Sequence, residues 1–139
     1  MEGDGVMNKP SVLFVCVHNA GRSQMALGFF THHAGDGAIA WSGGSEPGDQ
    51  INPIAIQAMA EEGIDISQGV PQLMTTEQVR DSDVVITMGC GDACAIYPGK
   101  RYLDWDLTDP AGLPIDEVRL VRDEIKLRVE SLLADLLPA

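Results

Sequence analysis

Cys16 and Arg22 are the residues of this sequence whose types and spacing most clearly indicate chemistry. They begin and end a Cys-x5-Arg segment, and Ser23 follows it directly. A cysteine thiolate is a strong nucleophile, and a guanidinium can bind two oxygens of a tetrahedral oxyanion at once. Ser23 could donate a hydrogen bond to the thiolate and stabilise it as a leaving group. The pattern therefore predicts a thiol nucleophile inside an oxyanion-binding site.

The backbone between these two residues is expected to provide most of the anion contacts. Successive N–H groups of a tight loop can point inward and form a nest, and we expect Gly21 to permit the unusual dihedral angles that this requires. A helix that begins after the loop adds positive potential, which also favours the thiolate form of Cys16. The predicted oxyanion-binding residues are Cys16, Val17, His18, Asn19, Ala20, Gly21 and Arg22.

The elements on either side of the loop are suited to position it. Residues 11–17 form a short, apolar, β-branched run that is typical of a buried strand, and residues 23–33 have helical composition with Ser23 as the expected N-cap. Because Cys-x5-Arg often occurs by chance, a buried Cys16 with Arg22 in a surface salt bridge is the alternative. The succession of strand, internal Gly, Ser and helix favours the functional site.

The rest of the chain continues to alternate strand and helix patterns. Strands are predicted at residues 39–42, 84–88 and 100–104, and helices at 53–62, 75–81 and 116–137. The last helix has one apolar face, formed by Val118, Val121, Ile125, Val129, Leu132 and Leu136. This order predicts an α/β fold with an open, mainly parallel sheet flanked by helices. Residues 1–9 are predicted to be a flexible tail and residues 10–139 a single domain.

Composition and charge exclude several classes of function. The 139 residues carry a formal net charge of −12, which argues against a nucleic-acid partner because phosphate backbones would repel this surface. An anionic substrate would then need a local site that outweighs the global charge. No apolar run is long enough to span a bilayer, and residues 1–9 do not resemble a signal peptide, so a cytoplasmic location is expected.

The sequence CVHNAGRSQMA, which begins at Cys16, resembles the anion loop of arsenate reductases built on the low-molecular-weight tyrosine phosphatase fold. The resemblance covers most of the chain and includes Ser42-Gly43-Gly44-Ser45, Thr87-Met88-Gly89-Cys90 and Asp109-Pro110. It implies a four-stranded parallel sheet flanked by helices. It also implies these roles: Cys16 as nucleophile, Arg22 as oxyanion binder, Ser23 as thiolate stabiliser, Asn19 as organiser of the loop, and Asp109 as general acid.

Two positions depart from the pattern of this family. Phosphatases of this fold usually have a second cysteine just before the loop arginine, where this chain has Gly21. Arsenate reductases that bind potassium beside the loop have a glutamate at the position of Leu27. The resemblance therefore implies no metal site, and no cofactor is expected.

Cys90 and Cys94 are the other two cysteines of the chain. They could be two ordinary thiols in a turn, or half of a zinc site, although no second ligand pair has suitable spacing. The resemblance implies a redox relay, in which Cys90 attacks Cys16 and Cys94 then attacks Cys90. Residues four apart on a helix lie too far apart for a disulfide, so a Cys90–Cys94 bond requires local unwinding, which Gly89 and Gly91 would favour.

The sequence therefore predicts an enzyme that reduces arsenate to arsenite, with phosphate or sulfate as competing anions. The expected electron donor is thioredoxin or a mycothiol- or glutaredoxin-like reductant. One alternative is a low-molecular-weight protein tyrosine phosphatase, but Ala111-Gly112 stand where such phosphatases carry aromatic residues beside the Asp-Pro pair. The other alternative is an oxyanion-binding protein without catalytic activity, which would not need Asp109 as an acid.

Overall fold

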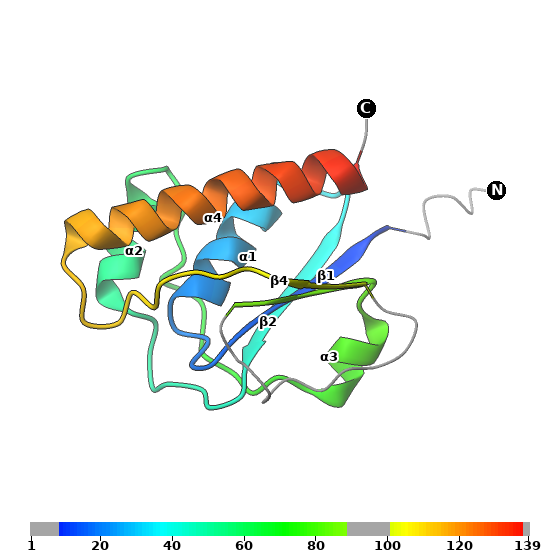
Figure 1. The fold of residues 1–139 in the computed structure, drawn as a ribbon, viewed down its shortest axis with the longest axis horizontal. Coiled ribbons are helices and arrows are strands. Elements are labelled where there is room, and N and C mark those ends of the chain that lie inside the picture. The colour runs from blue at the N-terminus through cyan, green and yellow to red at the C-terminus, as the bar shows by residue number, and fades with distance from the viewer. Residues whose placement is uncertain (1–8, 89–100, 138–139) are drawn as a thin grey trace.

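The computed structural model describes residues 9–88 and 101–137. Within these residues, four parallel strands form one sheet in the order β2-β1-β3-β4 (Figure 1). The strands are β1 (Ser11–Cys16), β2 (Ile39–Gly44), β3 (Val84–Thr87) and β4 (Arg101–Asp104). Ser11 pairs with Ile39 of β2, and Val12 pairs with Val84 of β3. The predicted α/β fold with a four-stranded parallel sheet is confirmed.

Helices cover both faces of the sheet. Figure 1 shows α1 (Arg22–Ala34), α2 (Pro53–Ala60) and α4 (Ile115–Leu136) on one face, and α3 (Thr76–Asp81) on the other. The alternating side chains of β1 divide between the two layers, because successive residues of a strand point to opposite faces. Val12, Phe14 and Cys16 join the core beneath α1 and α4, while Leu13 and Val15 pack with α3. Cys16 therefore ends a strand that is buried on both faces.

Helix α4 is amphipathic, as its sequence pattern predicts. Five of its six predicted core residues are buried, namely Val118, Val121, Ile125, Val129 and Leu132, and Leu136 near its end is half-buried. Its opposite face is mostly charged, although Leu120 and Leu127 are also exposed on α4. Neither α4 nor any other helix within residues 9–88 and 101–137 is long and apolar enough to cross a membrane.

Several helix boundaries differ from the prediction, and three of these differences have a local reason. Helix α2 ends at Ala60 instead of residue 62, because Gly63 adopts a positive φ of 75° and ends the helical turn. Thr75 lies outside α3 as its N-cap, in a capping box with Gln78. The N-cap of α1 is Gly21, so the prediction that Ser23 caps this helix is wrong. Ser23 lies inside α1, where its side chain is directed to Cys16.

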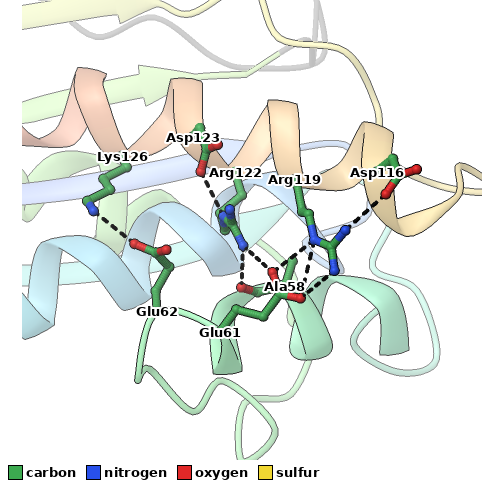
Figure 2. A network of polar contacts seen from close by, with 8 residues as sticks. All are labelled: Ala58, Glu61, Glu62, Asp116, Arg119, Arg122, Asp123 and Lys126. Carbon is green, nitrogen blue, oxygen red and sulfur yellow. Dashed lines mark hydrogen bonds and ion pairs between the residues drawn. The ribbon is translucent and has the colours of Figure 1, made fainter.

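A group of ion pairs, the α2–α4 ion-pair cluster, joins the end of α2 to α4 (Figure 2). Arg122, only 7% exposed, donates hydrogen bonds to the carbonyl oxygen of Ala58 at 2.9 Å and to Glu61 Oε1 at 2.7 Å. Arg119 binds both oxygens of the same carboxylate. Hydrogen bonds from Arg119 and then Arg122 lower the pKa of Glu61 from 4.5 to about 2. The remaining members of the cluster are Asp116, Asp123 and the pair Glu62–Lys126.

Candidate active site

The anion loop (residues 16–22) connects the end of β1 to the start of α1. β1 lies between β2 and β3, so the chain connections diverge to opposite sides at its carboxyl end. Ligands of open parallel sheets bind at such a switch point, outside the carboxyl ends of the strands. The segment that follows β4 returns to the same edge and brings Asp109 to Arg22. The fold therefore brings Cys16, Arg22 and Asp109 together where this architecture usually binds ligands.

Hydrogen bonds from the segment before α2 orient the backbone of the loop. The carbonyl oxygen of Val17 accepts from the N–H of Glu46 at 2.8 Å, and that of Ala20 accepts from the N–H of Asn52 at 2.8 Å. Among the described residues, none accepts a hydrogen bond from the backbone N–H groups of residues 17–21. With the carbonyl groups engaged outside the loop, these N–H groups are available to an anion, as in the nests of other anion-binding loops.

Asn19 holds the centre of the loop with its side chain and backbone. It is completely buried and adopts a positive φ of 49°, a conformation that asparagine tolerates better than most residues. Its Oδ1 accepts from Gln24 Nε2 and from the backbone N–H of Gln72, both at 3.0 Å. Its Nδ2 donates to Ser23 Oγ at 2.7 Å. The left-handed turn of the loop is therefore at Asn19.

Gly21 combines an unusual backbone conformation with a close contact. Its φ of −141° and ψ of −85° lie outside the helical and extended regions, in agreement with the unusual dihedral angles expected from the sequence. The residue is also in close contact with Pro110. A Cβ atom at position 21 would lie 2.9 Å from Pro110 Cγ. The space between the two segments therefore leaves no room for a side chain at this position.

The thiol of Cys16 lies at the base of the loop, with the residue 2% exposed. Its Sγ is 2.9 Å from Ser23 Oγ. Because Asn19 Nδ2 already donates to this Oγ, the serine hydroxyl can direct its own hydrogen toward the sulfur. A hydrogen bond donated to an ionised acceptor is stronger than one to a neutral acceptor. A hydrogen bond donated in this direction stabilises the thiolate of Cys16, and the thiolate is the form that attacks an electrophile.

Arg22 and Asp109 meet at the opening of the site. Arg22 is 6% exposed, and its Nη1 donates to the carbonyl oxygen of Leu107 at 3.4 Å. Its Nη2 lies 3.7 Å from Asp109 Oδ2. The Asp109 side chain is 51% exposed, and its Oδ1 accepts from the backbone N–H of Ala111. A fixed guanidinium and a carboxyl group therefore face the same space from two different segments.

That space is a small pocket of about 50 Å³. It is lined by the anion loop, by Asn52 and by residues 109–111. His18 lies at the exposed rim of the pocket, where its ring Nδ1 is 2.9 Å from the carbonyl oxygen of Glu46. Since a water molecule needs roughly 10–15 Å³ of such space, the pocket has room for one small tetrahedral ion. It is chemically suited to bind an oxyanion against a thiolate.

The structure brings together most of the predicted site residues and adds others. Cys16, Arg22, Ser23 and Asp109 lie within one site, whereas Cys90 and Cys94 lie outside the described residues. The roles of all of them stay predictions. The supporting contacts of Gln24, Gln72 and the Leu107 carbonyl were not predicted from the sequence. A polar residue on the buried side of α1 was a usable signal for Gln24, but the backbone contacts carry no signal in the sequence.

The sequence and the structure were compared with known proteins. Residues 11–138 match the family model described as low molecular weight phosphotyrosine protein phosphatase. An arsenate reductase 2 from Staphylococcus haemolyticus is 43% identical over 129 residues, which cover 90% of this chain and 97% of that protein. The similarity therefore spans nearly the whole of both sequences.

Two solved structures are similar in sequence and in fold. A thioredoxin-dependent arsenate reductase from Corynebacterium glutamicum is 44% identical, with a TM-score of 0.81. The match covers 91% of this chain but only 61% of that longer one. An arsenate reductase in its phosphate-binding state is 37% identical with a TM-score of 0.82, and the match covers 91% of this chain and 98% of that one.

Proposed function

Because this chain belongs to the low-molecular-weight phosphotyrosine protein phosphatase family, we propose that it reduces arsenate to arsenite with Cys16 as the nucleophile. The observation that carries the proposal is the hydrogen-bonded pair of Cys16 Sγ and Ser23 Oγ at the base of a small oxyanion-sized pocket. The similar proteins that are named arsenate reductase support arsenate as the substrate. Phosphate and sulfate share its charge and tetrahedral shape, and are expected to compete for the loop.

The first step is attack of the Cys16 thiolate on arsenic. The backbone N–H groups of the loop and Arg22 bind the oxygens of arsenate and stabilise the charge that accumulates on them. Asp109 donates a proton to the oxygen that departs, which leaves as water. A sulfur–arsenic bond has then replaced one oxygen–arsenic bond, and arsenic is still in its +5 state. The 3.7 Å distance between Arg22 and Asp109 supports a shared role at the opening of the site.

Reduction occurs in the second step, through Cys90 and Cys94. The Cys90 thiolate attacks Cys16 Sγ, and the electron pair of the sulfur–arsenic bond remains with arsenic, which leaves as arsenite. Two thiols are thereby oxidised to a Cys16–Cys90 disulfide, and arsenic gains two electrons. Cys94 then attacks Cys90 and frees Cys16. Neither relay cysteine lies in the described residues, so this step is supported by the three cysteines of the sequence and by family resemblance.

A protein dithiol must then reduce the Cys90–Cys94 disulfide. Thioredoxin is the proposed donor, since the similar protein from Corynebacterium glutamicum is thioredoxin-dependent. A mycothiol- or glutaredoxin-like donor would instead act directly on the arsenic adduct of Cys16. Free thiols persist in a reducing compartment, so we place the reaction in the cytoplasm.

The decisive experiment measures arsenate turnover in two donor systems. The wild-type chain and Cys16→Ser are each supplied with thioredoxin, its reductase and NADPH, or with a low-molecular-weight thiol and glutaredoxin. We expect turnover by the wild type with thioredoxin and none by Cys16→Ser. Alkylation of Cys16 should be rapid at neutral pH and slowed by phosphate or sulfate. Turnover by Cys16→Ser would refute the assignment of the nucleophile.

The same preparation separates the alternative functions. Rapid hydrolysis of an aryl phosphate without arsenate reduction would identify a phosphatase. Protection of Cys16 by arsenate, with no turnover of either substrate, would identify a binding protein. Each of these outcomes would overturn the proposed reaction.

A further inference from the structure

The contact between Gly21 and Pro110 joins the anion loop to the segment that carries Asp109. A Cβ atom at Gly21 would lie 2.9 Å from Pro110 Cγ and 3.7 Å from Pro110 Cδ. The first distance is shorter than the roughly 3.5–4.0 Å at which carbon atoms pack. Pro110 itself is buried, although its neighbours Asp109 and Ala111 are exposed. The proline ring therefore holds the part of the segment around Asp109, which is otherwise exposed, against the loop.

The position of Asp109 depends on this contact. One oxygen of its carboxylate lies 3.7 Å from Arg22 Nη2, which is a weak contact. The other oxygen accepts a hydrogen bond from the backbone N–H of Ala111, within the same turn. Neither interaction fixes the segment to the body of the protein as firmly as a buried, conformationally restricted proline ring. A side chain at position 21 would push the ring outward and move Asp109 with it.

The same contact limits the size of the pocket. Asp109, Pro110 and Ala111 line one side of a space of about 50 Å³, and Gly21 lines it from the loop. By comparison, a cavity that binds benzene measures roughly 150 Å³. The oxyanion head of a substrate fits within this space, but the space has no room for an aryl group attached to it.

We propose that Gly21 is a specificity-determining residue, because the absence of a side chain there lets Pro110 close the pocket around a bare tetrahedral oxyanion and positions Asp109 above it. This inference rests on the proposed function, since it concerns the choice between arsenate and aryl phosphate esters at the same site. Because Gly21 acts on the carboxyl group of Asp109 through Pro110, it is also a positioning residue for Asp109.

The test replaces Gly21 with alanine and with serine, and uses Gly48→Ala as the matched control. A Cβ atom at Gly48 would lie 3.7 Å from Ala20 Cβ and 3.8 Å from the His18 carbonyl oxygen, which are ordinary contacts beside the same loop. Three quantities are measured: kcat for arsenate, hydrolysis of 4-nitrophenyl phosphate, and protection of Cys16 from alkylation by phosphate.

Gly21→Ser should lower kcat for arsenate by roughly tenfold or more, because misplacement of a catalytic group by about 1 Å can cost a hundredfold. The activated nitrophenolate group needs little help from an acid, so the ratio of aryl phosphate to arsenate turnover should rise by a similar factor. Gly21→Ala should give a smaller change in the same direction. Protection by phosphate should stay within about twofold of wild type, as should all three quantities for Gly48→Ala.

A double-mutant cycle with Pro110→Ala tests whether the effect passes through the proline. With the ring removed, Gly21→Ser should no longer change the ratio of the two activities. An unchanged ratio in Gly21→Ser itself, or an equal change with and without Pro110, would overturn the inference. Failure of the proposed function would instead appear as absent arsenate turnover by the wild type. In that case the hydrolysis of 4-nitrophenyl phosphate still tests the role of Gly21, since widening of the pocket in Gly21→Ser should raise its rate.

Discussion

The side chain of Asn19 determines the direction in which the Ser23 hydroxyl donates its hydrogen. Its amide nitrogen donates to Ser23 Oγ, so the serine hydroxyl is free to donate to Cys16 Sγ. Its amide oxygen is held by Gln24 and by the backbone of Gln72, which fixes the orientation of the amide group. The direction of this short chain of hydrogen bonds matters because only a donated hydrogen stabilises a thiolate. The hydrogen bond between Ser23 and Cys16 thus depends on contacts from α1 and from the segment that contains Gln72.

Asp109→Asn tests the proposed general acid. Asparagine keeps the shape of the side chain but has no proton to give, and a positioned general acid typically contributes about 10²–10⁴-fold in rate. We expect kcat for arsenate to fall within this range, while phosphate protects Cys16 from alkylation at least as well as before. The exposed Asp106→Asn is the control and should leave both quantities unchanged. Equal losses of binding and rate in Asp109→Asn would indicate a structural role.

Helix α2 supports the anion loop at one end and depends on α4 at the other. Its N-cap, Asn52, donates its backbone N–H to the carbonyl oxygen of Ala20. A helix of only eight residues is marginal by itself, and a carboxylate at its C-terminal end opposes the helix dipole. Arg119 and Arg122 neutralise that carboxylate, Glu61, and fix it to α4 (Figure 2). The α2–α4 ion-pair cluster therefore contributes indirectly to the geometry of the loop.

Glu61→Gln should lower the melting temperature by a few degrees at neutral pH, with the effect shrinking in acid. The pKa of Glu61 is about 2 in the folded protein and 4.5 as its ordinary value. The ionised carboxylate therefore contributes its full stabilisation above pH 4.5, and this is lost as the pH falls toward 2. Thermal unfolding followed by circular dichroism between pH 7 and pH 3 measures the difference.

Glu124→Gln is the control for this prediction. Glu124 forms an exposed pair with Arg128 one turn along α4, and exposed pairs of this kind contribute little. Its effect on the melting temperature should be smaller than that of Glu61→Gln at neutral pH. A difference between wild type and Glu61→Gln that stays constant from pH 7 to pH 3 would contradict the prediction.

At the scale of the whole molecule, a chain of net charge −12 has to admit an anion to a buried thiol. Charges in solution are screened over roughly 8 Å at physiological ionic strength, so the N–H groups of the loop and Arg22 determine the field at the site. Because Cys16 is buried, we expect that a protein reductase does not reach its sulfur directly. A relay that moves the disulfide to Cys90 and Cys94 would solve this problem of access.

Cys94→Ser tests the relay. The variant should release one arsenite per enzyme and then stall as a Cys16–Cys90 disulfide, because no thiol remains to attack Cys90. Mass spectrometry of peptides from the stalled enzyme would identify the linkage. Cys90→Ser is the control, and should release no arsenite with thioredoxin as donor. Repeated turnover by Cys94→Ser at the wild-type rate with thioredoxin would exclude the relay and favour attack by an external thiol.

The elements with strong apolar patterns were predictable from the sequence. The apolar run that forms β1 and the apolar face of α4 were both identified, because a strand buried on both faces is continuously apolar and a helix with one buried face is apolar with a period of about 3.6 residues. The boundary of α2 and the cap of α1 were missed. In both places the end of the helix depends on a competing interaction, the turn at Gly63 and the hydrogen bond between Ser23 and Cys16.

The sequence by itself determined that a thiol, a guanidinium and a hydroxyl lie close together where a strand is followed by a helix. Cys16, Arg22 and Ser23 lie within eight consecutive residues, so short-range geometry is enough to bring them together. Only the tertiary structure decided that Asp109 faces Arg22, that Gly21 makes room for Pro110, and that Asn19 takes the left-handed turn. These contacts join segments that are distant in sequence, and steric fit between such segments leaves no periodic trace in the chain.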